Sequence, residues 1–399
     1  MKIDWLKPLL GHPGPFATLY LDATPAAEAG DRDVANRWRA VRKSLVHQGA
    51  PEAVLGEVET AVLRPTRAGG PHGRVVIADD TGVLVDRVVK SPPAVASGVW
   101  APVPALLQAA LATDESVEVL CVTVDRQGAD FARWGTGGKT TWSFEASHDE
   151  IAKTSSPNTK HARIESRAED SWGRNAEAVA VEVERQVMAG RPEIVLLTGD
   201  VRAVPLVRAE LVRPVAELTV EVHGGGRGAG VRADTFEEHV EDALDSFRER
   251  RRELVLAELR QELGREAGAV TSLADVVSVL ARGQVKELVL AEEYATEAAT
   301  DGRLGTRKLW IGPSPLDIAP TRRDLESLGV TERLEELPAT IALVRSAIGQ
   351  DAGLTFAPEG SVDLIEGVGA TLRWHDEGTP TEAVHSMSGD DMRRRGDLV

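Results

Sequence analysis

The residues best suited to chemistry lie in a long polar segment, residues 143–174, which we call the basic finger. It follows an apolar stretch, 117–124, that predicts a buried strand, and it precedes an amphipathic helix predicted over 175–188. Connections this long inside compact domains are usually functional or disordered. Lysine and arginine contact phosphate, and tryptophan stacks on bases. The candidate RNA-binding residues are Lys153, Lys160, His161, Arg163, Arg167, Trp172 and Arg174.

Each candidate also has a plainer interpretation. Trp172 packs against the following helix as a staple just as readily as it stacks on a base. The cations of the finger could belong to a solvated loop, but their local charge, together with the family resemblance described below, favours RNA contact. If the finger took part in hydrolysis, a group such as His161 or a backbone-held water would have to act in place of a general base.

Two strand-end carboxylates suggest a second kind of site. Asp125 and Asp200 each end a predicted strand, and clustered carboxylates can hold Mg²⁺ for nuclease chemistry. Aspartate in this position is more often a turn former, and no third ligand stands out. The sequence contains no zinc, P-loop, dinucleotide or serine-hydrolase signature. We therefore expect no catalytic residue, metal or cofactor.

The net charge and its distribution along the chain limit which classes of partner the protein can bind. The chain of 399 residues has 46 Lys and Arg against 63 Asp and Glu, a net charge of −17, which excludes a general DNA or nucleic-acid binder. The net charge is +1 over 1–113, −5 over 114–230 and −13 over 231–399. The strongly acidic last part is better suited to meeting protein than phosphate.

The single cysteine, Cys121, lies in an apolar strand and predicts a buried thiol without a disulfide. The N-terminus shows no signal peptide, and no stretch reaches the ~20 apolar residues of a membrane span. We expect a cytoplasmic protein without membrane contact.

The elements suggest an α/β protein of three domains. Strands and helices alternate over 1–113, and an antiparallel meander and a parallel strand at 193–199 mark a middle domain over 114–223. A glycine-rich segment over 224–233 predicts a hinge at Gly224, Gly225 and Gly226. A long helix over 234–264 opens a C-terminal α/β domain, 234–377, and the tail 378–399 is expected to be disordered.

Two C-terminal motifs resemble the last domain of archaeo-eukaryotic class-one release factors and Pelota. In residues 271–293 a helix is followed by a turn at Gly283 and a strand that ends in acid, and residues 364–374 look like the closing strand. The chain looks most like the bacterial branch, the actinobacterial ribosome hibernation factors related to Balon. The resemblance implies a ribonuclease-H-like middle domain and a C-terminal domain similar to a kink-turn-binding protein.

The resemblance also implies a function. In release factors the loop leaving the middle sheet carries Gly-Gly-Gln, whereas the finger here has no glutamine and no glycine before Gly173. We expect a stress-related hibernation factor that regulates translation by occupying the acceptor site of idle or stalled 70S ribosomes, contacting rRNA up to the peptidyl transferase centre. Elongation factor Tu is the implied partner of the acidic domain.

Two alternatives stay open. A peptide-release or peptidyl-tRNA hydrolase rescue factor would lose release activity when a single finger residue is changed. A ribosome-independent stress-related interaction protein would not associate with ribosomes at any salt concentration.

Overall fold

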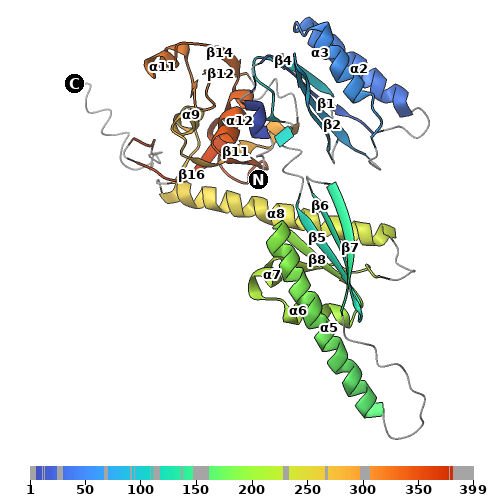
Figure 1. The fold of residues 1–399 in the computed structure, drawn as a ribbon. Coiled ribbons are helices and arrows are strands. Elements are labelled where there is room, and N and C mark those ends of the chain that lie inside the picture. The colour runs from blue at the N-terminus through green and yellow to red at the C-terminus, as the bar shows by residue number, and fades with distance from the viewer. Residues whose placement is uncertain are drawn as a thin grey trace. The chain divides into compact units, whose positions relative to one another are not determined.

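The computed structural model describes residues 6–10, 12, 14–24, 30–66, 71–89, 92–93, 95–107, 109–110, 117–135, 138–146, 161–227, 233–265, 268–296, 306–376 and 378–380. Two compact units make up the protein (Figure 1). The middle unit comprises residues 116–251. The composite unit comprises residues 1–115 together with 252–399.

The middle unit contains a five-stranded sheet in the order β7-β6-β5-β8-β9. Strands β5, β6 and β7 form the expected antiparallel meander, and β8 and β9 extend it in parallel beyond β5. The strands are β5 (Val119–Val124), β6 (Gly128–Gly135), β7 (Gly138–Glu145), β8 (Ile194–Gly199) and β9 (Thr219–Glu221).

Both faces of this sheet are covered, because successive side chains of a strand point to opposite faces. Leu120 and Val122 of β5 pack in one core, with helices α5 (His161–Gly190), α6 (Ala203–Glu210) and α7 (Arg213–Leu218). Val119 and Cys121 pack on the other face, in a cluster with Val240 of helix α8 (Ala233–Arg265). Burial on both faces explains why β5 and β8 are apolar along their whole length.

The composite unit begins with an antiparallel sheet in the order β3-β2-β1-β4. Helices α2 and α3 pack on it through a core around Trp38, Leu45 and Leu55. The elements are β1 (Phe16–Asp22), α2 (Gly30–His47), α3 (Glu52–Val62), β2 (Gly73–Asp79), β3 (Gly82–Val89) and β4 (Ser97–Ala101).

The C-terminal part of this unit has two further sheets, in the orders β10-β16-β11-β15 and β13-β12-β14. The strands are β10 (Ala269–Val270), β11 (Val285–Ala291), β12 (Lys308–Ile311), β13 (Ile318–Ala319), β14 (Glu335–Pro338), β15 (Gly353–Ala357) and β16 (Val368–Leu372). The helices are α9 (Leu273–Ala281), α10 (Glu293–Thr296), α11 (Arg322–Ser327) and α12 (Ala339–Gly349), with a 3₁₀ turn at Ile365–Gly367.

One hydrophobic core joins the first and last parts of the chain. Leu9 of the short helix α1 (Lys7–Leu10), Phe16 and Ile77 belong to the same buried cluster as Val276 and Leu343. A shared core of this kind makes 1–115 and 252–399 one compact unit, although the sequence separates them by more than a hundred residues.

The expected α/β architecture and most expected elements are confirmed, but the extent of the finger as a loop is wrong. Helix α5 begins at His161, not at Asn175, so the second half of the finger is helical. Residues 161–172 contain no proline or glycine, and a helix propagates readily from a packed segment into such a sequence. The segments around β4, β12, β13 and β14 were not predicted as strands, because they are short and interrupted by proline or charge.

The lengths of helices α5 and α8 and the described part of the C-terminal tail do not alter the fold given above. Among the described helices, none combines the length and the apolar character needed to cross a bilayer, although α5 and α8 have 30 and 33 residues. Of the expected disordered tail only 378–380 are described, and there Gln284 donates to the Thr379 hydroxyl.

The buried thiol gives a direct test of the middle-unit core. Burial raises the pKa of Cys121 to about 11, so at pH 8 only about one thiol in a thousand is ionised. We expect the native protein to react with a thiol reagent at pH 8 at least about a hundredfold more slowly than the protein in concentrated urea. Comparable rates in the two states would show that β5 is not held between its two cores.

Candidate functional site

The carboxyl edge of the parallel pair β5 and β8 brings together residues that are far apart in the sequence. The two strands pair in register from Val119↔Ile194 to Val124↔Gly199, so Asp125 and Asp200 leave the sheet at the same edge. Ligand sites of open α/β sheets concentrate at this edge. We call it the finger base.

Both aspartates act first as turn formers. Asp125 Oδ1 accepts hydrogen bonds from the main-chain N–H groups of Gln127 and Gly128, at 2.8 and 2.9 Å. Asp200 Oδ1 accepts from the N–H of Arg202 at 2.8 Å. Within the described residues no group of three His, Cys, Asp or Glu could hold a metal ion. The geometry therefore favours the turn interpretation over a nuclease site.

The side chain of Arg227, the residue directly after Gly226, contacts the carboxylates of the finger base. Its Nη1 lies 2.9 Å from Asp125 Oδ1 and its Nε lies 3.1 Å from Asp130 Oδ1, and it also donates to Glu145 at the end of β7. Burial lowers the pKa of Arg227, but the hydrogen bonds to Glu145 and Asp125 outweigh burial and raise the pKa above its ordinary value. This side chain ties the last residue of β7 to the turn after β5.

The glycines before Arg227 are held close to the same sheet. The N–H of Gly225 donates to Thr198 Oγ1 at 3.1 Å, and a Cβ at Gly225 would meet Thr198 atoms at 2.6 Å. Gly224 has φ +95°, a conformation that glycine adopts at no steric cost. Gly226 follows, and residues 228–232 lie outside the described part of the chain. A hinge at Gly224, Gly225 and Gly226 stays a prediction.

Trp172 is half-buried at the finger base. The guanidinium of Arg126 lies 4.4 Å from its ring centroid, within cation–π range. Leu206 and Val207 of α6 line the same small pocket. One ring face is thus covered by an arginine, an arrangement nearer to the staple interpretation than to an open stacking platform.

Helix α5 carries the remaining cations of the finger on one face. At 100° per residue, positions 163, 167 and 174 fall within about 40° of one another. Asp170 shares that face, whereas Glu165 and Glu169 fall roughly opposite, on the side where Val179 and Val183 enter the core. Arg174 is exposed. Lys153 and Lys160 lie outside the described residues, and His161, Arg163 and Arg167 are described in their backbone only.

This sidedness matters because the finger as a whole is not basic. Residues 143–174 contain five Lys and Arg and six Asp and Glu, a net charge of −1. The name basic finger therefore holds only for one helix face. Among the α5 residues whose burial is described, 172–190, the buried ones begin at Asn175, and the preceding backbone over 161–171 spans roughly 17 Å of helix.

Three arginines of the finger base were not predicted, namely Arg126, Arg202 and Arg227. Arg126 follows Asp125 directly, and Arg202 comes two residues after Asp200. Two parallel strands that each end in aspartate followed closely by arginine are a usable signal. Nothing near Arg227 in the sequence indicates its three carboxylate partners.

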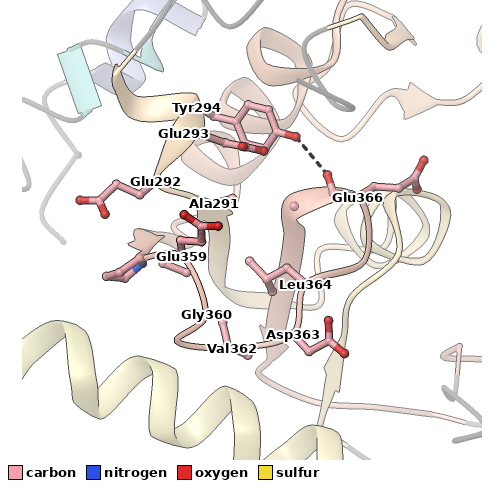
Figure 2. Close-up of a pocket in the computed structure, with 13 residues that line it drawn as sticks. Ala291, Glu292, Glu293, Tyr294, Glu359, Gly360, Val362, Asp363, Leu364 and Glu366 are labelled. Carbon is pink, nitrogen blue, oxygen red and sulfur yellow. Dashed lines mark hydrogen bonds between the residues drawn. The ribbon is translucent and has the colours of Figure 1, made fainter. Parts of the chain in front are cut away.

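The acidic part of the chain forms a second candidate site, shown in Figure 2. Strands β11 and β15 are parallel, from Glu287↔Gly353 to Ala291↔Ala357, and a pocket of about 950 Å³ opens beyond their carboxyl ends. We call it the acidic pocket. Its lining includes five carboxylates, Glu292, Glu293, Glu359, Asp363 and Glu366.

A tight turn shapes one wall of the acidic pocket. Glu366 has φ +57° and Gly367 φ +74°, and the Tyr294 hydroxyl donates to the Glu366 carbonyl at 3.3 Å (Figure 2). The Glu366 carboxylate is already engaged, with Arg307 at 3.5 Å and the N–H of Leu273 at 3.2 Å. Glu292, Glu359 and Asp363 are exposed, so they give the pocket its negative field.

Comparison with known proteins gives a family match over the middle unit. Residues 118–265 match the model of bacterial archaeo-eukaryotic release factor family 2. Two uncharacterized proteins of Mycobacterium tuberculosis, from strains CDC 1551 and H37Rv, are 26% identical over 386 residues, which is 94% of this chain and 97% of theirs.

Solved structures that the chain matches include Archaeoglobus fulgidus Pelota, with 10% identity, a TM-score of 0.34, and 94% of this chain and 92% of that chain covered. An archaeal Pelota in a ribosome-bound model with ABCE1 has 13% identity, a TM-score of 0.39, and coverages of 93% and 94%.

The Arg227 contacts generate a stability prediction. Changing Arg227→Gln leaves Asp125 and Glu145 without their shared cation, so we expect the free energy of unfolding of the middle unit to fall by about 1–4 kcal/mol in urea denaturation. The matched control is Arg213→Gln, which removes an exposed pair with Glu217 and should change stability little. Equal effects of the two changes would contradict an anchoring role for Arg227.

Proposed function

We propose that this chain, whose residues 118–265 match the model of bacterial archaeo-eukaryotic release factor family 2, is a cytoplasmic hibernation factor. It binds idle or stalled 70S ribosomes at the acceptor site and contacts rRNA through the finger. What supports the proposal is the helical spacing of Arg163, Arg167 and Arg174, which places these three positions on one side of the α5 backbone.

The chemistry of the finger supports binding rather than hydrolysis. Between Ser143 and Trp172 there is neither glycine nor glutamine, so the segment lacks the residue that positions water in release factors. Arginine guanidinium groups match phosphate geometry, and a row of them on one helix face can follow an RNA backbone. The opposite, acidic side of the helix limits contact to one orientation, which gives specificity to a chain with a net charge of −17.

The acidic pocket supports a protein partner at the composite unit. An open pocket with exposed Glu292, Glu359 and Asp363 suits a basic side chain of a second protein. We assign this role to elongation factor Tu, which would accompany the chain to the ribosome. Separate surfaces for RNA and for protein allow the two interactions to be disrupted independently.

Ribosome binding is tested by co-sedimentation with vacant 70S ribosomes. We expect the triple change Lys160→Ala, Arg163→Ala and Arg167→Ala to weaken binding at least about tenfold and to reduce its salt dependence, because fewer counterions are released. The matched control, Arg213→Ala, Arg265→Ala and Arg322→Ala, also removes three cations, here arginines that pair with glutamates on their own helices. It should leave binding nearly unchanged.

The same gradients decide between the candidate functions. Failure of the wild type to co-migrate at low salt, with elongation factor Tu present, would overturn the ribosomal role and favour a ribosome-independent protein. Release of peptide from ribosomes by the wild type, lost in the finger variant, would replace hibernation by rescue.

The protein partner is tested by charge reversal. We expect Glu359→Lys with Asp363→Lys to reduce binding of elongation factor Tu at least about fivefold, because like charges then face the partner's cation. A control with the same charge change elsewhere on the composite unit, Glu57→Lys with Glu332→Lys, should bind normally. A loss common to both variants would point to net charge rather than to the acidic pocket.

A further inference from the structure

A second pocket in the composite unit is lined mainly by apolar groups. It measures about 500 Å³ and lies between residues 9–16 and 102–104 on one side and residues 311–345 on the other. Its walls include Leu9, Phe16, Val103 and Ile311. Small-molecule sites commonly have this size, with apolar walls and a few polar groups that fix orientation.

The polar group at this pocket is Arg345 of α12, whose residue surface is only 3% exposed. Nη1 donates to the Ser314 carbonyl at 3.0 Å, and Nη2 donates to the carbonyls of Gly312 and Pro313 at 3.0 and 2.9 Å. A guanidinium has five N–H groups. The Nε–H and one Nη1 hydrogen therefore have no acceptor among the described residues.

The charge of Arg345 is not neutralised by these contacts. All three acceptors are uncharged carbonyls, and Arg345 forms no ion pair with a carboxylate of the described chain. Burial lowers the pKa of Arg345, and the more distant Asp317 only partly opposes this. A buried cation without a counter-charge is costly, so an anion in the pocket would be strongly favoured.

The rim of the pocket adds further charge. His12 and Arg333 line it, with Glu335 as the opposing carboxylate. His12 is held in place, since its Nδ1 lies 3.3 Å from the buried Asp79 Oδ2. Arg333 and Glu335 are exposed, so their side chains can be changed without disturbing a core.

We propose that this pocket binds a small molecule bearing one anionic group, a carboxylate or a phosphate, on an apolar body, with Arg345 as the recognising cation. The anion takes the free N–H groups of Arg345, and the apolar body occupies the space between Phe16 and Ile311. The site draws its walls from both ends of the chain, so its occupant stabilises their packing in the composite unit. It does not depend on ribosome binding.

The competing interpretation is that Arg345 only braces the loop at 312–314. The two interpretations differ in what rim residues do. If Arg345 only holds the loop, the charges of Arg333 and Glu335 should not affect the affinity for an anion. If the pocket binds an anion, changing either charge should change that affinity.

The experiment is calorimetric titration of the full chain with phenylacetate, phenyl phosphate and the neutral phenylacetamide. We expect at least one anion to bind with a Kd of about 1 mM or tighter, and the amide at least about tenfold more weakly. Preference between the two anions identifies carboxylate or phosphate as the natural group.

Three variants place the binding in this pocket. Arg333→Gln should weaken anion binding about two- to fivefold, and Glu335→Gln should strengthen it by a similar factor. Arg323 is an exposed arginine of α11 that does not line the pocket, so Arg323→Gln should leave the affinity for the anion unchanged. Arg345→Met, with folding checked by circular dichroism, should abolish the preference for anions.

Equal binding of anions and amide would overturn the proposal, as would an absence of binding by the folded wild type at millimolar concentrations. Equal effects of Arg323→Gln and Arg333→Gln would also overturn it, because they would show that only overall charge matters.

Discussion

The parallel pairing of β5 with β8 is the constraint on which the middle unit depends. These strands are separated in the chain by a hairpin, the finger and α5, yet they meet over six consecutive residue pairs. Parallel neighbours need a crossover, and α5 supplies it by packing Val179 and Val183 onto the sheet. Because the crossover helix is much longer than the strands, its first turns extend past the sheet. The finger therefore follows from sheet topology.

Parallel pairing also determines where polar side chains from distant parts of the chain lie close together. At the finger base it unites the turns that follow β5 and β8, and in the composite unit the pair β11 and β15 opens the acidic pocket in the same way. The two edges differ in character, because arginines pair with carboxylates at the first, whereas exposed carboxylates line the second.

Two arginines, the half-buried Arg227 and the buried Arg345, show how context decides the role of one residue type. Arg227 meets Asp125, Asp130 and Glu145, so its charge is satisfied and it acts as an anchor for the segment after the glycines. Arg345 meets only main-chain carbonyls, so its charge remains available to a ligand. Neither arginine stands in a recognisable motif, and their difference arises from which loops fold over them.

The amino-acid sequence by itself determined the α/β class, the meander, the parallel strand at β8, the long helix α8 and the burial of Cys121. Each of these features is indicated by a local periodicity or by a run of apolar residues. It also indicated the finger as the place of interest. It placed the start of α5 wrongly, because a polar helix without an apolar stripe looks like a loop, and the packed half of α5 propagates the helix into it.

Only the tertiary structure decided which charges act together. The partners of Arg227 lie 82 to 102 residues away in the chain, and the walls of the Arg345 pocket come from opposite ends of it. Side-chain periodicity is a local property, whereas electrostatic compensation depends on distances that exist only after the sheets have formed. For the same reason the net charge of the finger conceals its cationic face, which appears once helical geometry sorts its residues by side.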